Sequence, residues 1–72
     1  MLMMPEAGHV RVAVYDVSGR EVTVLADQEF GAGRHPMTWN TNESGSHAPS
    51  GLYFIRAIGL GKSWVERLIV TH

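Results

Sequence analysis

The sequence predicts an all-β fold, a small antiparallel β-sandwich of five to seven strands in a single domain over residues 1–72. Three observations lead to this class. Short stretches of alternating apolar and polar residues recur between turn-forming residues along the chain. No window keeps the apolar spacing of a helix for even two turns. One stretch is almost continuously apolar, which is typical of a strand buried between two sheets.

The clearest element is a hairpin over residues 10–25. Apolar residues at every second position from Val10 to Val14 predict a strand with one buried face. Asp16 can open a type I turn because its carboxylate accepts hydrogen bonds from the following backbone, and Gly19 can close that turn with a one-residue bulge. β-branched residues alternate again after the turn, and they predict the second strand.

The middle of the chain predicts one strand between two irregular stretches. Residues 26–33 are polar and contain glycine, so we expect a connection there, from which Phe30 turns back onto the core. A third strand is predicted over residues 34–39. Pro36 has no N–H to donate, so this strand should lie at a sheet edge or direct the proline nitrogen outward. Residues 40–50 form the longest polar stretch and predict a loop of consecutive turns.

The end of the chain predicts a second hairpin. Residues 51–58 are nearly continuously apolar and should form a central strand buried on both faces. Residues 59–62 contain two glycines and predict a tight turn. Residues 63–71 predict the last strand. Its alternation leaves the inward face ambiguous, and we favour Leu68 and Val70 pointing inward.

The start of the chain is short of residues for a full strand. Residues 1–4 are apolar and are either the stump of a strand or an addition to the domain, and residues 5–8 predict a turn. A chain of 72 residues without cysteine has neither disulfides nor thiolate metal sites to support a small core. We therefore expect a part of a larger protein, a homodimer, which could form through an open sheet edge, or a thermally robust fold.

Charge and motif content argue against several classes of function. Six basic and seven acidic residues give a net charge of -1, which does not suit a nucleic-acid surface. No apolar run approaches the ~20 residues of a membrane span, so we expect no membrane insertion. We expect no metal or other cofactor, because the histidines lack the spacing of a zinc site: His9, His35, His47 and His72. Neither a nucleophile elbow nor a dinucleotide fingerprint is present, so we expect no enzyme.

The aromatic side chains allow two interpretations. We expect Trp39 and Tyr53 to belong to the core, where the Tyr53 hydroxyl could hold a loop. Trp64, at the rim of the last strand, is the best candidate for an exposed ring. If several rings were exposed and coplanar, the domain would instead suit a carbohydrate-binding or adhesion module of a polysaccharide-degrading enzyme.

Several blocks of sequence together resemble the C-terminal sorting domain of type IX secretion cargo, type A. Residues 12–22, VAVYDVSGREV, resemble the VYDxxGREV block of that family. Residues 31–40 resemble its aGxHxxxWd block, residues 50–56 its sGxYxxr block, and residues 62–70 its closing strand. The blocks contain residues that we expect to build turns and core: Asp16, Gly19, Gly33, Trp39, Gly51 and Tyr53.

The resemblance implies a seven-stranded Ig-like sandwich at the end of a large exported enzyme or adhesin of the Bacteroidetes and their relatives. Such a domain is a recognition tag and not an enzyme. Its partners are an outer-membrane secretion translocon and a cell-surface sortase, so it passes through the periplasm and reaches the cell surface or the medium. By analogy, recognition would lie on the last two strands and the tail, at Lys62, Arg67, Val70, Thr71 and His72.

A second family is similar in the same regions. The Ig-like domain of the flagellar hook-capping protein shares the tryptophan and Gly-Tyr patterns, and it implies the same fold. A structural Ig-like assembly domain is therefore a further alternative. The sorting family opens with a strand that precedes the turn at residues 5–8, so we expect this sandwich to lack part of its first strand.

Overall fold

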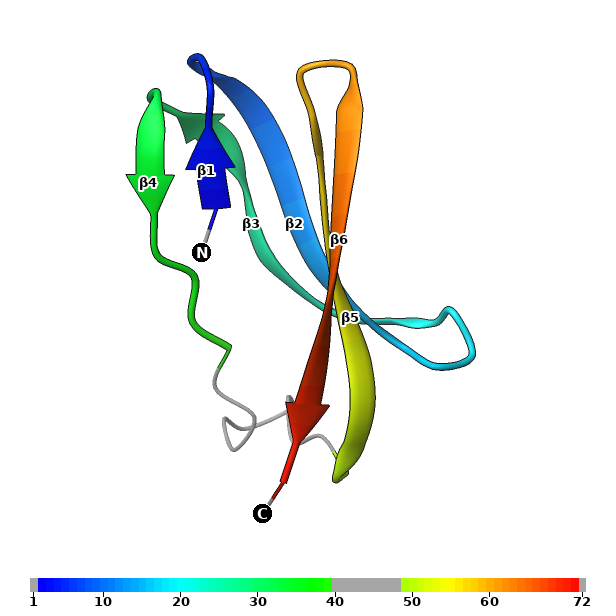
Figure 1. Ribbon diagram of the computed structural model, residues 1–72. Helices are drawn as coiled ribbons and strands as arrows, with labels where there is room; N and C mark the ends of the chain where they lie inside the picture. Colours follow the sequence, from blue (N-terminus) through cyan, green and yellow to red (C-terminus); the bar gives the residue numbers. More distant parts are fainter. Residues whose placement is uncertain (1, 40–48, 72) are drawn as a thin grey trace.

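A computed structural model describes residues 2–39 and 49–71 of the chain. The described residues contain no helix and form six strands, which are β1 (Leu2–Met4), β2 (Gly8–Asp16), β3 (Glu21–Phe30), β4 (Gly33–His35), β5 (Gly51–Gly59) and β6 (Lys62–Val70). One sheet has four antiparallel strands in the order β3-β2-β5-β6, and the other pairs β1 with β4. The predicted all-β sandwich is confirmed (Figure 1).

The two sheets differ greatly in size. In Figure 1 the short strands β1 and β4 lie beside one end of the long hairpin β2–β3, and the chain then runs on toward the other end. Each sheet presents apolar side chains to the other. The core therefore has two parts, one under the small sheet and one under the segment that follows β4.

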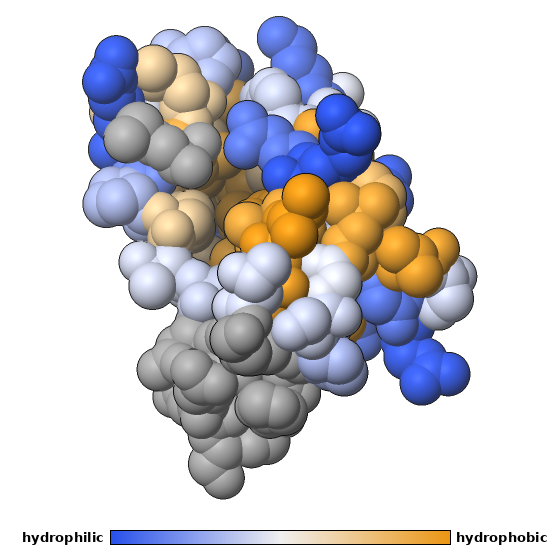
Figure 2. Space-filling view, turned by 60° about the horizontal axis from the view of Figure 1, so that its bottom comes forward, coloured by the Kyte–Doolittle hydropathy of each residue, from blue (hydrophilic) through white to orange (hydrophobic). Residues whose placement is uncertain are grey.

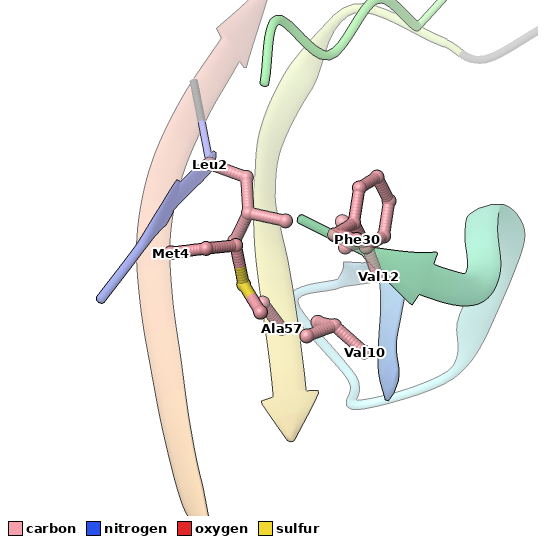
Figure 3. Close-up of a cluster of buried hydrophobic side chains, with 6 residues drawn as sticks. All are labelled: Leu2, Met4, Val10, Val12, Phe30 and Ala57. Carbon is pink, nitrogen blue, oxygen red and sulfur yellow. The ribbon is translucent and has the colours of Figure 1, made fainter. Parts of the chain in front are cut away.

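The first part of the core joins both sheets (Figure 3). Met4 is 2% exposed and Val10 is 0% exposed, so Met4, together with the buried Leu2, packs β1 onto the large sheet, whereas Met3 faces outward. Phe30 is also buried, as predicted, and its ring meets that of His35 edge-on. The complete cluster is Leu2, Met4, Val10, Val12, Phe30 and Ala57. Leu2–Met4 thus forms a strand of the small sheet.

The second part of the core lies toward the end of the domain where β6 finishes. Val14, Tyr53 and Val70 are buried there, and the half-buried Trp39 and Leu68 pack against them. The predicted inward orientation of Leu68 and Val70 is confirmed. Alternation places Trp64 on the same face of β6, and its half-buried ring packs against the first cluster.

The β2–β3 turn has the hydrogen bonds that the sequence predicts. The Gly19 N–H donates to the Asp16 carbonyl at 3.0 Å, and the Asp16 N–H donates to the Arg20 carbonyl at 3.0 Å. One carboxylate oxygen of Asp16 accepts from the Ser18 N–H at 2.9 Å and from the Arg20 N–H at 3.0 Å. Gly19 has a φ of 87°, which a residue with a side chain adopts only at a cost.

Asp16 makes stability depend on pH. The Ser18 hydroxyl and, after it, the backbone N–H of Arg20 hold the pKa of this carboxyl below its usual value. A pKa that folding lowers adds stability above the unfolded pKa of ~3.9, and this stability is lost as the pH falls through the folded pKa. When the pH is lowered from about 6 to about 3, the free energy of unfolding should fall less for Asp16→Asn than for the wild type. Urea titrations at each pH measure this free energy. Glu6→Gln, at an exposed carboxylate outside the turn, controls for net charge.

Two predicted boundaries are wrong. The predicted connection over residues 26–33 is mostly strand, because β3 continues to Phe30 and pairs with the first half of β2. As an edge strand, β3 can turn charged side chains to water while its backbone pairs on one side. The predicted strand over residues 34–39 is only β4, which ends directly before Pro36 because proline cannot continue the ladder.

The predicted burial of residues 51–58 on both faces is also wrong. β5 does lie between β2 and β6 in the sheet, but only its inward face is covered. Leu52 and Ile58, on the outward face, remain 37% and 42% exposed. The small sheet lies on the inward side, and no described strand covers the outward side.

Candidate partner-recognition site

β6 forms a free edge of the large sheet. Among the described residues it pairs only with β5, from Gly51 opposite Val70 to Gly59 opposite Lys62. A nine-residue edge strand leaves a row of backbone N–H and C=O groups that can pair with another strand. The resemblance to sorting domains implies that partner recognition lies in this part of the molecule.

The predicted recognition residues do not converge on one point. Lys62 begins β6 and Thr71 follows its other end, so the two lie about 30 Å apart at the usual rise per residue. Arg67 is exposed in the second half of the strand, whereas Val70 is only 7% exposed and belongs to the core. His72 lies outside the described residues. The structure therefore arranges these residues along a strand and not around a pocket.

The residues assigned to turns and core lie at element boundaries and in the second cluster. Gly33 opens β4 with a φ of 115°, and Gly51 opens β5. Trp39 and Tyr53 meet edge-to-face, with ring centroids 5.1 Å apart and an interplanar angle of 72°. The Tyr53 hydroxyl donates to the Pro49 carbonyl at 2.7 Å, and so holds the segment before β5 as the sequence predicted.

The aromatic rings do not form a sugar-stacking platform. Tyr53 is 6% exposed, and the large angle between its ring and that of Trp39 rules out a common plane for the two. Trp64 is half-buried against the first cluster. Since none of the Trp, Tyr and Phe side chains is fully exposed, the carbohydrate-binding alternative loses the feature on which it depended.

The outward face of β5 and β6 is an exposed apolar surface that sequence reasoning missed. Val65 and Ile69 of β6 are 58% and 72% exposed, and Leu52 and Ile58 of β5 lie on the same face. Figure 2 shows apolar residues gathered at the surface between hydrophilic ones. The sequence feature that could have indicated this face is the continuous apolar run of β5, from which we predicted burial on both faces within the domain. Exposed apolar area of this kind marks an interaction surface.

A small groove opens on the inward side between β1 and β6. Its volume is about 220 Å³, and one carboxylate, Glu66, lies among otherwise apolar side chains. The lining consists of Leu2, Met3, Val12, Met37, Ile55, Ala57, Trp64 and Glu66. No sequence signal could have identified this groove, because its walls come from five separate parts of the chain.

One ion pair and one histidine–carboxylate contact lie on the β2–β3 hairpin. The Arg11 guanidinium donates to the Glu21 carboxylate at 2.6 Å, and this contact raises the pKa of Arg11. The His9 ring nitrogen lies against the Asp27 carboxylate. Outside residues 1, 40–48 and 72, which are not described, no three His, Cys, Asp or Glu side chains gather as a metal site would require. The described part of the chain also contains no helix that is long and apolar enough to span a membrane.

Comparison with known families gives one match. The profile of the FlgD Ig-like domain family matches residues 2–61, which covers β1 through β5 and the turn that follows β5. Most of β6 lies beyond the matched residues. Neither the curated proteins nor the solved structures contain a match to the chain.

Proposed function

This chain belongs to the FlgD Ig-like domain family, and we propose that it acts as the sorting module of a larger exported protein. In this role it is a recognition tag without catalytic activity. The proteins of a type IX translocon in the outer membrane recognise its β6 edge, and a cell-surface sortase then recognises the same edge. The domain would cross the periplasm and reach the cell surface or the medium.

One observation carries this proposal: β6 is both the free edge of the large sheet and mostly outside the family match. A strand that needs only one neighbour for its fold can present its other edge to a partner. The resemblance of residues 62–70 to the closing strand of sorting domains lies in the same element. Arg67 gives this strand an exposed positive charge close to the apolar Val65 and Ile69.

A structural role in an assembly is the second candidate. The family match supports an Ig-like module of this kind, and the exposed apolar residues on the outward face give it a surface for contacts. Such a role requires self-association or a fixed neighbour, and it does not require a translocon. A secretion experiment therefore separates the two candidates.

We expect the chain to direct a fluorescent reporter with a signal peptide to the surface or medium of a host that has a type IX translocon. The same fusion should remain in the periplasm of a translocon-deficient strain. A double variant Lys62→Glu, Arg67→Glu should be retained in the intact host, with at least ~10-fold less exported fluorescence, because both positive charges of β6 are reversed.

The matched control is Arg34→Glu, which reverses one exposed charge on β4, in the other sheet. Its export should equal that of the wild type. Far-UV circular dichroism of the purified domains checks that each variant is folded. Periplasmic retention of the wild-type fusion in the intact host would contradict the sorting proposal and favour the structural role.

A further inference from the structure

One row of side chains on the outward face of the large sheet has opposite charges at its two ends, so it is complementary in charge to a second, reversed copy of the same row. Tyr15 of β2 lies opposite both Glu21 of β3 and Phe54 of β5, and Phe54 lies opposite Arg67 of β6. Residues opposite one another on antiparallel strands share a face. The row therefore begins with an acid, ends with a base and has two aromatic rings between them.

The row points away from the core. Val14 and Tyr53 are buried, so the next residues along each strand, Tyr15 and Phe54, face outward. The Arg11 guanidinium holds Glu21 at 2.6 Å and lies on the same face. Both aromatic side chains are half-buried, whereas Glu21 and Arg67 are exposed.

The neighbouring row is mainly apolar. Ala13 lies opposite Val24 on one side and Arg56 on the other, and Arg56 lies opposite Val65. Val24 and Val65, at the two ends of this row, are 41% and 58% exposed. The outward face therefore combines exposed apolar area with an acid at one edge and a base at the other, and it also carries Arg11 and Arg56 on the two central strands.

We propose that two copies of this chain form a dimer by stacking these outward faces, with the two-fold axis parallel to the strands. This rotation places β3 of one copy over β6 of the other, and β2 over β5. Glu21 of each copy then meets Arg67 of the second copy, and Tyr15 meets Phe54 between the two ion pairs. Aligned sheets stack about 10 Å apart with a crossing angle of about 30°, a distance that such side chains can span.

Charge selects this arrangement over the other two-fold stacking. An axis across the strands at this row would place β6 on β6 and β3 on β3, so that Arg67 would face Arg67 and Glu21 would face Glu21. Like charges opposed at close range disfavour association. The axis parallel to the strands turns both repulsions into attractions.

The stacked area indicates a weak dimer. Four strands spaced by about 4.8 Å, over roughly six residues each, give a footprint of about 400 Å². A stable interface buries about 800 Å² per partner, so we expect a dissociation constant on the order of 10–100 µM. This inference goes beyond the sorting proposal, because it concerns self-association and holds whether or not a translocon recognises the domain.

Sedimentation velocity of the full chain from ~5 µM to ~1 mM tests the dimer, since this range spans the expected dissociation constant. We expect a reversible monomer–dimer equilibrium that Arg67→Glu and Glu21→Arg each weaken at least ~10-fold, because every substitution acts at both symmetric contacts. An equimolar mixture of the two variants should dimerise again, since each then supplies the charge that the other needs. Arg34→Glu, outside this face, should associate like the wild type.

Three results would overturn the proposal. They are a monomeric wild type over the whole range, an Arg67→Glu variant that dimerises like the wild type, and two monomeric variants that remain monomeric when mixed. The second result would point to pairing through the free edge of β6. Because Glu21→Arg also removes the partner of Arg11, Phe54→Glu is a further variant, which places a charge in the centre of the interface and should abolish the dimer.

Discussion

Gly59→Ala should destabilise the domain by about 3 kcal/mol or more, and so lower its melting temperature by roughly 15 °C. A Cβ atom at this position would lie 2.5 Å from the carbonyl oxygen of His9 and 2.7 Å from Cγ2 of Val10. Gly59 pairs directly with Val10, whose side chain is 0% exposed. To make room, β5 must separate from β2 at the end of the ladder between these two central strands, next to the β5–β6 turn. Urea and thermal unfolding followed by tryptophan fluorescence measure the loss.

Gly8→Ala is the matched control for this prediction. Its added Cβ would meet only the end of the Leu60 side chain, in the β5–β6 turn. A flexible side chain can move aside, whereas a paired backbone carbonyl cannot, so we expect a loss of about 1 kcal/mol. Equal losses for the two variants would show that the close approach of β5 to β2 at Gly59 is not as described.

The hairpins and turns could be predicted from the sequence because local chemistry determines them. Asp16 and Gly19 specify their turn through hydrogen bonds and a backbone conformation that few other residues supply. The valines of β2 alternate with the period of a strand, and all three on the inward face are buried. At these positions the sequence and the tertiary structure favour the same conformation.

The boundaries that failed depend on neighbours far away in the chain. The polar residues after Leu25 look like a loop, yet pairing with β2 holds them in a strand as far as Phe30. The apolar run of β5 indicates that both faces avoid water, but it does not say whether a second sheet or a second molecule covers the outer one.

For the candidate site, the strand that carries it could be predicted, but the residues that come together on it could not. A resemblance directed attention to the last strand, and the structure makes that strand a free edge. The row that ends in Arg67 could not be found beforehand, because it joins four strands and the β2–β3 register depends on a bulge next to Tyr15. Charges at positions 21 and 67 have no evident relation in the sequence and become the two ends of one row in the sheet.

Phe30→Ala should remove about 3–4 kcal/mol of unfolding free energy. The ring is 7% exposed and packs within the cluster that joins the two sheets, and its centroid lies 4.9 Å from that of His35. A domain of 72 residues has a total stability of roughly 4–11 kcal/mol, so this loss removes at least about a quarter of it and raises the unfolded fraction at 37 °C. Urea titration at 25 °C gives the free energy, and proteolysis at 37 °C reports the unfolded fraction.

Two substitutions show whether this effect comes from the space between the sheets. Phe30→Leu keeps most of the buried volume and should cost about 1–1.5 kcal/mol. Val24→Ala removes apolar atoms from the same strand at a residue that is 41% exposed, and should cost under ~1 kcal/mol. If Phe30→Ala costs no more than Val24→Ala, the small sheet is not anchored through Phe30. A large difference would mean that three residues of β1 and three of β4 form a true second layer because one aromatic ring connects them to β2 and β3.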